Sequence, residues 1–198
     1  NSTVIAGTSN SIDAKSLTGD GKVLSNGDMS VNLTDDFTNN ATVQAANNLT
    51  LTSAGNVTNN SKIVAGATNS INAENINNVN GAEISGGTTK LTANDAVTNR
   101  GLIDGINTVV KGNTVTNLGT GRIYGDHLSI GANTLTNTVE NGTAATIAAR
   151  NRLDIGATTI NNQEHSTLFS GGDMSIGGAL DANNNATGRA NVINNESA

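Results

Sequence analysis

The chain is built from a repeat of about 20 residues, which limits the folds open to it more than any other feature. One unit, from Lys62 to Glu83, reads KIVAGATNSINAENINNVNGAE and contains three short apolar clusters separated by Gly, Ala, Asn or Ser. The first apolar residue of each unit recurs at Val4, Val23, Val43, Ile63, Ile84, Ile103, Ile123, Ile147, Leu168 and Val192. Such recurrence is the signature of a solenoid of stacked coils.

Each unit carries two further apolar clusters. The second is at Ile12, Val31, Leu51, Ile71, Leu91, Val110, Ile130, Ile155 and Ile176, often with another apolar residue two positions earlier. The third is at Leu17, Phe37, Val57, Ile76, Val97, Val115, Leu135, Ile160 and Leu180. Alternation of apolar and polar residues is typical of strands. Three short strands per unit predict an all-β parallel β-helix of about nine coils, with residues 1–198 as a single repeat region.

Composition favours an ordered β-structure with a thin core. Aromatic residues make up 2% of the chain, so Val, Ile and Leu must fill the interior. The chain has no Pro, which suits a backbone whose N–H groups are committed to ladders. Asn, Gly, Thr and Ser fill the gaps between apolar residues, and these residues are poor in helix interiors. We therefore expect almost no helix.

A second repeated feature follows the third strand. One asparagine lies two residues beyond the third apolar cluster in most units, at Asn39, Asn59, Asn78, Asn99, Asn117, Asn137 and Asn162. If these residues occupy equivalent positions, their amides can hydrogen-bond up and down the stack as an Asn ladder. The alternative is that Asn is simply common in the turns of this chain.

Two units are longer than the rest. One has extra residues around 138–145 and the other around 181–189. Insertions in a solenoid project from its side, where recognition often resides, although sequence drift without function would produce the same pattern. The candidate contact residues are Glu140, Asn141, Asn183, Asn184, Asn185 and Arg189.

The sequence shows little sign of catalytic or metal-binding chemistry. His127 and His165 lie in different units, without the spacing of a metal site, and the chain has no cysteine. The adjacent acids Asp35 and Asp36 fit a solvated corner better than an active site. Other acids do not share one repeat position, and the Gly-rich calcium nonapeptide is represented only by the fragment Gly171-Gly-Asp173. We expect no enzyme activity, no cofactor and no bound metal.

Charge and hydropathy exclude two further classes. The formal net charge is −6, and Lys and Arg are scattered singly, so nucleic-acid binding is not expected. No apolar run is long enough for a transmembrane helix, and no leader opens the chain. We expect a segment that does not span a membrane and is internal to a longer protein.

Several phrases resemble a known family. They are Val97 to Ile103 (VTNRGLI), Leu118 to Ile130 (LGTGRIYGDHLSI), Ala145 to Ile155 (ATIAARNRLDI) and Gly171 to Ile176 (GGDMSI). They look like the haemagglutinin repeats of filamentous-haemagglutinin-type exoproteins, and most of all like the effectors of contact-dependent growth inhibition. The resemblance covers essentially the whole chain and rests on the sum of many repeats.

The resemblance implies a right-handed β-helical filament on the surface of a Gram-negative bacterium. It further implies export through an outer-membrane two-partner secretion transporter, with adjoining coils of the parent exoprotein on either side. In the inhibition systems the filament presents a receptor-binding region and carries a distal toxin. No segment of this chain departs from the repeat as a toxin domain would.

Three functional hypotheses remain open at this stage. The first is a structural filament segment that holds distal elements away from the cell. The second is a receptor-binding segment of the same filament, with the longer units in contact with a target-cell outer-membrane receptor. The third and most remote is a polysaccharide-cleaving β-helix enzyme, which would need clustered carboxylates on one face.

Overall fold

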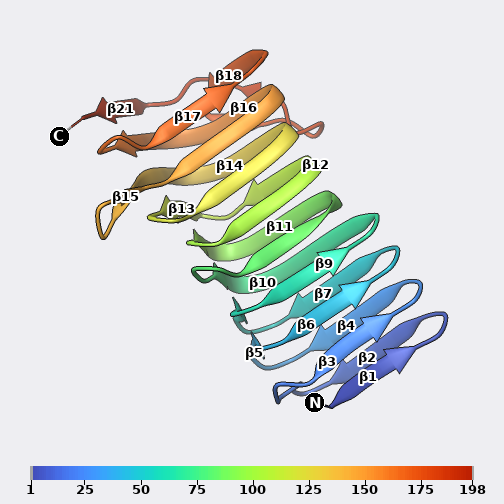
Figure 1. Cartoon of the computed structure of the whole chain (residues 1–198). Coiled ribbons are helices and arrows are strands. Elements are labelled where there is room, and N and C mark those ends of the chain that lie inside the picture. Colours follow the sequence, from blue (N-terminus) through green and yellow to red (C-terminus); the bar gives the residue numbers. More distant parts are fainter. Residues whose placement is uncertain (1, 198) are drawn as a thin grey trace.

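The protein is a β-solenoid of about nine stacked coils. The computed structural model describes residues 2–197, and all regular structure in that range is β-strand. The two ends of the chain lie at opposite ends of the stack (Figure 1). This confirms the predicted parallel β-helix. Each coil contributes strand segments to a first, a second and a third face, numbered in chain order.

In the N-terminal coils every strand is short and confined to one face. These strands are β1 (Thr3–Ala6), β2 (Asn10–Ala14), β3 (Lys22–Ser25), β4 (Met29–Leu33), β5 (Phe37–Asn39), β6 (Thr42–Ala45), β7 (Leu49–Ser53), β8 (Val57–Asn59) and β9 (Lys62–Ala65). Tight corners separate them. A Cβ on Gly27 would lie 2.0 Å from the carbonyl oxygen of Thr8, so the corner accepts no side chain there.

In the middle coils the strands continue round the corners. They are β10 (Thr68–Asn78), β11 (Glu83–Asn99), β12 (Leu102–Lys111), β13 (Thr114–Leu118), β14 (Arg122–Glu140), β15 (Thr143–Ala144) and β16 (Thr146–Gln163). Irregularities turn the longer strands from one face to the next. The register between β14 and β16 shifts between Gly125 and His127, which is the bend from the first face to the second.

The last coil contains β17 (Thr167–Ser170) on the first face and β18 (Asp173–Gly177) on the second. The chain then forms the antiparallel pair β19 (Ala179–Leu180) and β20 (Ala186–Thr187) before β21 (Val192–Glu196) completes the third face. Strand β21 pairs in parallel with the end of β16, where Ile193 lies opposite Ile160.

The last coil corrects two expectations from the repeat. Val192 does not begin a tenth unit, because it lies in the third strand of the ninth coil, opposite Thr159. Leu180 is not the third-face residue of that coil, because it belongs to the antiparallel pair. The insertion therefore separates the second and third strands of one coil.

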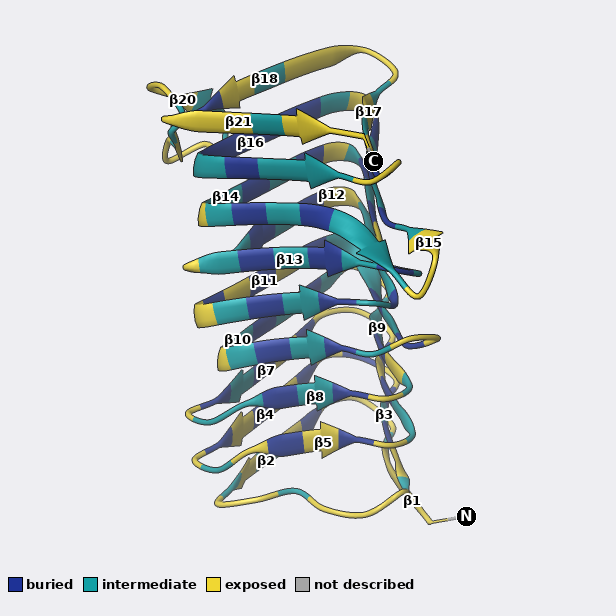
Figure 2. Ribbon diagram, turned by 90° about the vertical axis from the view of Figure 1, so that its left-hand side faces the viewer, coloured by how far each residue is buried: buried dark blue, intermediate teal, exposed yellow. Residues whose placement is uncertain are grey.

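The core consists of aliphatic columns that run along the axis. On the first face, Ile84 pairs with Ile63 in the coil before and with Ile103 in the coil after, and all three side chains are fully buried. Figure 2 shows buried residues alternating with residues of intermediate burial along the strands of the middle coils. Since a single coil cannot enclose its own apolar side chains, the stability of each coil depends on its neighbours.

At the two ends of the stack the same columns open to solvent. Val4 in β1 is 53% exposed and Ile193 in β21 is 54% exposed, although equivalent residues in the middle coils are fully buried. No coil covers these side chains in the structure. The terminal coils therefore gain less from apolar burial than the middle ones.

Candidate interaction surface

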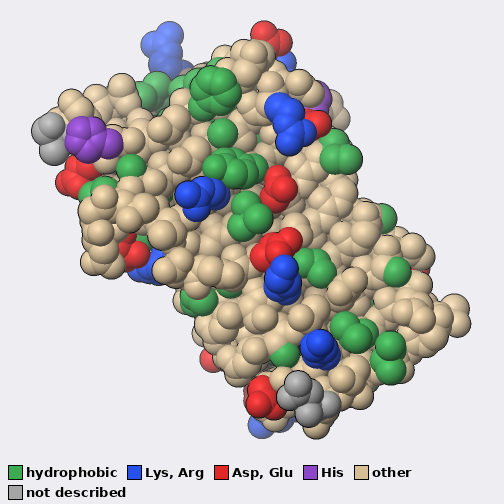
Figure 3. Space-filling model, viewed as in Figure 1, with side chains coloured by type: hydrophobic (Ala, Val, Ile, Leu, Met, Phe, Trp, Pro, Cys, Tyr) green, Lys and Arg blue, Asp and Glu red, His purple; other side chains and the backbone are tan. Residues whose placement is uncertain are grey.

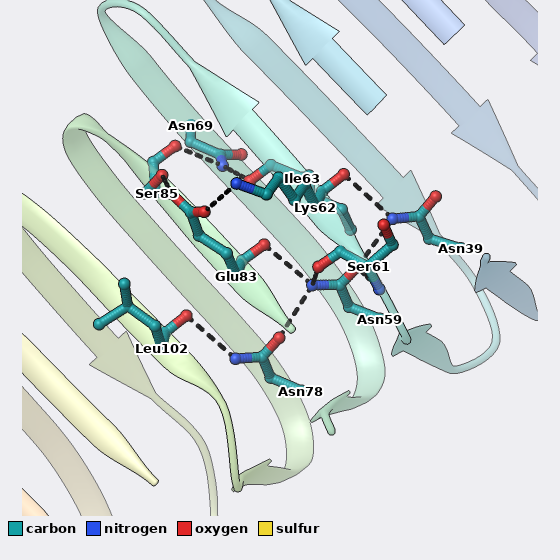
Figure 4. A network of polar contacts seen from close by, with 10 residues as sticks. All are labelled: Asn39, Asn59, Ser61, Lys62, Ile63, Asn69, Asn78, Glu83, Ser85 and Leu102. Atoms are coloured by element: carbon teal, nitrogen blue, oxygen red, sulfur yellow. Dashed lines mark hydrogen bonds and ion pairs between the residues drawn. The ribbon is translucent and has the colours of Figure 1, made fainter. Parts of the chain in front are cut away.

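A continuous column of asparagines lies inside the third face (Figure 4). The Nδ2 atom of each residue donates to the Oδ1 atom of the next, starting with Asn39 to Asn59 at 2.7 Å. The chain of side-chain bonds runs on through Asn78, Asn99, Asn117, Asn137 and Asn162 at 2.8–2.9 Å. The structure thus places all seven expected asparagines in one column.

Each inner asparagine also donates a hydrogen bond to the backbone two coils further along the stack. Asn59 donates to the carbonyl oxygen of Glu83 at 3.0 Å, and Asn137 donates to that of Thr167 at 3.0 Å. These bonds tie the third face of one coil to the start of the next but one. The column therefore satisfies buried polar groups at the corner between the third and first faces.

The column has an eighth member that the repeat did not reveal. Asn162 donates to Oδ1 of Asn195 at 2.9 Å, across the insertion in the last coil. The repeat predicts a new unit beginning at Val192, so Asn195 falls outside the expected positions. The correct signal is the spacing within the third strand, since Asn195 follows Ile193 by two residues as Asn162 follows Ile160.

The first longer unit forms a tight β-hairpin. Strands β14 and β15 pair Val139 with Ala144 and Glu140 with Thr143. Asn141 and Gly142 form the turn with φ values of 51° and 73°. Two consecutive positive φ values are the mark of the type I′ turn, for which Asn-Gly is the preferred sequence. Asn141 is exposed at the tip.

Glu140 at the base of this hairpin is engaged within the protein. Its carboxylate accepts two hydrogen bonds from the guanidinium of Arg100, at 2.7 and 2.9 Å. These bonds from Arg100 lower the pKa of Glu140 below its ordinary value. Arg100 precedes Glu140 by 40 residues, so the pair bridges two coil steps. Glu140 fastens the hairpin to the side of the solenoid, and the exposed part of this insertion is its tip.

The second longer unit, residues 178–191, forms a loop closed by β19 and β20. Asp181 organises its tip, because Oδ1 accepts from the backbone N–H groups of Asn183 and Asn185, both at 2.9 Å. The hydrogen bonds from Asn185 lower the pKa of Asp181. Asn184 has a φ of 64°, and Gly188 one of 68°. The asparagines are thus held in a defined turn.

This loop packs against the second face at a column of glycine positions. A Cβ on Gly156 would be 2.2 Å from the carbonyl carbon of Ala179, and one on Gly177 would be 2.4 Å from the carbonyl oxygen of Thr187. In the coil before, a Cβ on Gly131 would be 3.1 Å from Leu180. Gly131, Gly156 and Gly177 occupy the same position of successive coils. The loop can approach the sheet closely because these positions lack side chains.

Asp154 anchors the loop from the sheet. Its Oδ1 accepts the backbone N–H of Ala186 at 2.9 Å, and its two oxygens accept from Arg152 at 2.6 and 3.0 Å. Burial acts to raise the pKa of Asp154, but the hydrogen bonds from Arg152 and Ala186 outweigh it, so the pKa lies below its ordinary value. Asp154 is not among the candidate residues predicted from the sequence. The sequence signal that could have indicated this anchor is an acidic residue at an outward position, two residues before the glycine position.

A polar groove of about 340 Å³ runs between the loop and the second face. Asn183, Asn184 and Asn185 form one side. Residues from four successive coils form the other, among them Lys90, Asn107, His127 and Arg152. The groove offers ammonium, imidazole, guanidinium and amide donors, while its one carboxylate, Asp154, is occupied by Arg152. Arg189 is exposed near the loop's return to the sheet and does not line the groove.

The remaining candidate residues do not converge. His165 is exposed in a turn with a φ of 65°, far in sequence from His127 in the groove. Asp35 lies 3.9 Å from Lys15, and Asp36 accepts hydrogen bonds from Asn56. Within residues 2–197 no group of three or more His, Cys, Asp or Glu side chains is arranged to hold a metal ion.

The repeat itself identifies the family. The family model described as haemagglutinin repeat matches the chain three times, over residues 5–61, 57–120 and 128–198. The chain belongs to the haemagglutinin repeat family. The first match runs from β1 to the corner before β9, and the last includes the insertion in the final coil. The chain matches no curated protein and no solved structure.

Membership of the haemagglutinin repeat family gives the general setting of the protein. Together with the β-solenoid, it fits a structural filament segment of an adhesin-type exoprotein that is secreted or displayed at the cell surface. Among the described residues there is no helix long and apolar enough to cross a membrane.

Proposed function

We propose that this chain is a spacer segment in the filament of a contact-dependent growth inhibition exoprotein. In this role it is exported by a two-partner secretion transporter to the outer surface of a Gram-negative cell. It then holds receptor-binding and toxin elements at a distance from that surface. The observation that supports this role best is the asparagine column, which links successive coils from Asn39 to Asn195.

A spacer must keep the distance between its two ends fixed. Each coil of this chain is fixed to the next by backbone ladders and aliphatic columns, and from the second coil onward also by the asparagine bonds. Because no contact depends on a single central core, coils can be added without changing the interactions of the others. The open apolar columns at Val4 and Ile193 fit adjoining coils of the same exoprotein.

We also propose that the segment is not an enzyme. Two acids with the potential for catalysis are paired with arginines, Asp126 with Arg150 and Asp154 with Arg152. A general acid in a glycosidase instead needs a raised pKa, and the pKa of Asp154 is lowered. A screen on polyuronate and neutral polysaccharide substrates should give no cleavage, and release of reducing ends would contradict this part of the proposal.

A second candidate role is contact with a target-cell receptor. One observation favours it. The loop 178–191 packs closely on glycine positions of the second face and is hydrogen-bonded to Asp154, so Asn183 and its neighbours are held in a fixed arrangement. Fixed polar groups beside a groove lose little entropy on binding. The receptor in this reading is an outer-membrane component of another bacterium.

The two roles can be separated with a trimmed variant. In the eighth coil the second and third strands are joined through Ala157 and Thr158, whereas the ninth coil has residues 178–191 at that place. Replacing 178–191 by Ala-Thr should leave β18 and β21 paired with β16. Circular dichroism and thermal unfolding would verify that the variant folds.

The intact and trimmed chains, fluorescently labelled, are then applied to a panel of intact Gram-negative cells. The spacer role predicts no saturable binding by either chain. Saturable binding by the intact chain that disappears on trimming would overturn the passive role and establish the receptor-binding one. Asn141→Ala, at the tip of the other insertion, serves as a matched control that leaves residues 178–191 unchanged.

A further inference from the structure

The first face carries an aromatic cleft on its outer surface. Tyr124 in β14 pairs with Ala148 in β16, which pairs in turn with Phe169 in β17. The two aromatic residues therefore occupy one outward column with a small residue between them. They line a cleft of about 260 Å³ together with Asp104 and Arg150. Figure 3 shows hydrophobic side chains gathered beside charged ones over the C-terminal coils of this face.

The aromatic side chains are unusual in this molecule. The chain has two Phe, one Tyr and no Trp. Phe37 is buried in the core, whereas Phe169 is 54% exposed. Two of the three aromatic side chains thus lie in a single surface cleft. Exposed aromatic residues that converge on a concave site are a mark of ligand binding.

The spacing of the coils sets the distance between the aromatic positions. Adjacent strands lie about 4.8 Å apart, so Tyr124 and Phe169, two strands apart, are separated by about 9.6 Å. A group held midway above Ala148 would be about 4.8 Å from each aromatic position. A cation is attracted to an aromatic face at centroid distances up to about 6 Å. The cleft therefore has the width to hold one cationic group between two rings.

Charge in the cleft favours a cation. Arg150 is neutralised by its ion pair with Asp126. Arg122 lies in the neighbouring strand β14. Its Nη1 donates to the carbonyl oxygen of Thr120 at 3.2 Å, and Arg122 does not line the cleft. Asp104 lines the cleft, and no Lys, Arg or His lies within ion-pair distance of it among residues 2–197. Asp104 lies beside Tyr124 in the same outward column, on the side away from Ala148. Its carboxylate is therefore about two strand spacings from a cation held above Ala148 and attracts it at long range.

We infer that this cleft binds an alkylammonium group between the aromatic side chains of Tyr124 and Phe169, with a long-range attraction from the carboxylate of Asp104. The site is independent of the loop 178–191, which lies on the second face. It gives the filament a lateral binding site in addition to its spacer role. The chemistry is shared by a choline-type headgroup and by the side chain of a lysine.

The test is a titration of the isotopically labelled chain with choline and, separately, with n-butylammonium. Amide chemical shifts of Gly125, Ala148 and Ala149 report on the cleft. Both cations are expected to shift these signals saturably, and the tighter of the two identifies the source as a headgroup or a lysine side chain. The neutral isostere 3,3-dimethylbutan-1-ol should bind at least about tenfold more weakly, a difference of about 1.4 kcal/mol.

Variants on the surface locate the site without disturbing the core. Tyr124→Ala should weaken binding of the cation about tenfold and Asp104→Asn about twofold, and Ala148→Leu should abolish it by filling the cleft. Val64→Ala, in the same outward column but outside the cleft, is the matched control and should bind as the unaltered chain does.

Three results would overturn the inference. The first is the absence of shifts at the cleft amides with either cation at about 100 mM, where a millimolar site would be nearly full. The second is equal binding of choline and its neutral isostere. The third is unchanged affinity in a Tyr124→Ala variant that folds normally by circular dichroism.

Discussion

Asn78 donates to Oδ1 of Asn99 at 2.8 Å and also to the carbonyl oxygen of Leu102 at 3.0 Å. Its own Oδ1 accepts from Asn59 at 2.9 Å. One fully buried side chain thus links four successive coils. Asparagine is suited to this position because its amide donates two hydrogen bonds and accepts on the oxygen within a small volume.

Replacing Asn78 by alanine should destabilise the solenoid strongly. The change removes three hydrogen bonds and leaves the carbonyl oxygen of Leu102 and the amide of Asn59 without this partner. Buried polar groups that lose a partner cost about 1–3 kcal/mol each, so we expect a loss of about 3 kcal/mol in the free energy of unfolding. Chemical denaturation monitored by circular dichroism measures it.

The matched control is Asn77→Ala, in the adjacent position of the same strand. The Oδ1 atom of Asn77 makes no hydrogen bond among the described residues. The free energy of unfolding should therefore change by no more than about 0.5 kcal/mol. Equal effects of the two substitutions would show that the column contributes nothing particular.

The aliphatic columns should be most sensitive in the middle of the stack. Ile123 is fully buried, and truncation to alanine should cost about 2–5 kcal/mol because it opens a cavity between packed coils. Ile193 occupies an apolar column at the open end and is 54% exposed, so the same truncation should cost less than about 1 kcal/mol. Thermal and chemical unfolding of both variants would reveal the gradient, and equal losses would argue against stabilisation by neighbouring coils.

The close packing of the loop 178–191 on the glycine positions of the second face can be tested by adding one methyl group. Gly156→Ala places a Cβ 2.2 Å from the backbone of Ala179, so residues 178–191 must move away from the second face. We expect faster amide hydrogen exchange at Ala186, with the exchange of the middle coils unchanged. Gly7→Ala is the control, since nothing lies within 4 Å of its added Cβ. Unchanged protection of Ala186 in Gly156→Ala would contradict the docking described above.

The anchor at Asp154 should respond to acid. Its folded-state pKa lies below the ordinary value of 3.8, so its contribution to stability is present above that value and is lost as the pH falls through the folded pKa. The loop 178–191 should therefore loosen below about pH 3.8. Protection factors of Ala186, corrected for the intrinsic exchange rate, measure this. Asp154→Asn should remove most of the pH dependence, and an identical acid response in that variant would exclude Asp154 as its source.

The sequence predicts the fold well because the same physical requirement acts on every coil. The inward position of Ile63, Ile84 and Ile103 must be apolar in each turn of the stack, so the pattern repeats and can be read directly. The residues of the interior column follow the same period. Asn195 was not predicted as a member of the column, because an insertion precedes it and because Leu180 resembles the third apolar cluster of a unit although it lies in the antiparallel pair.

Contacts between coils outside the period were harder to foresee. The pairing of Arg100 with Glu140 joins residues that are 40 positions apart, and no repeat position requires it. The insertion at 181–189 was recognised from length alone, but its docking depends on glycines in two earlier coils. Tyr124 and Phe169 lie in the same outward column, two coil steps apart. Their separation in the sequence does not reveal this, because one of the intervening units is longer than the repeat.

A distance measured between the two ends of the stack shows whether the chain is a rigid rod of stacked coils. Ser11 and Ser175 occupy the same outward position of the first and ninth coils, linked through every register in between. The chain has no cysteine, so a spin label can be attached specifically at each after substitution by cysteine. Eight coil steps of about 4.8 Å predict a separation of about 38 Å between the labelled backbones. A single narrow distance distribution near that value, in electron spin resonance, is the expected result. A broad distribution, or one centred well below it, would contradict a rigid spacer.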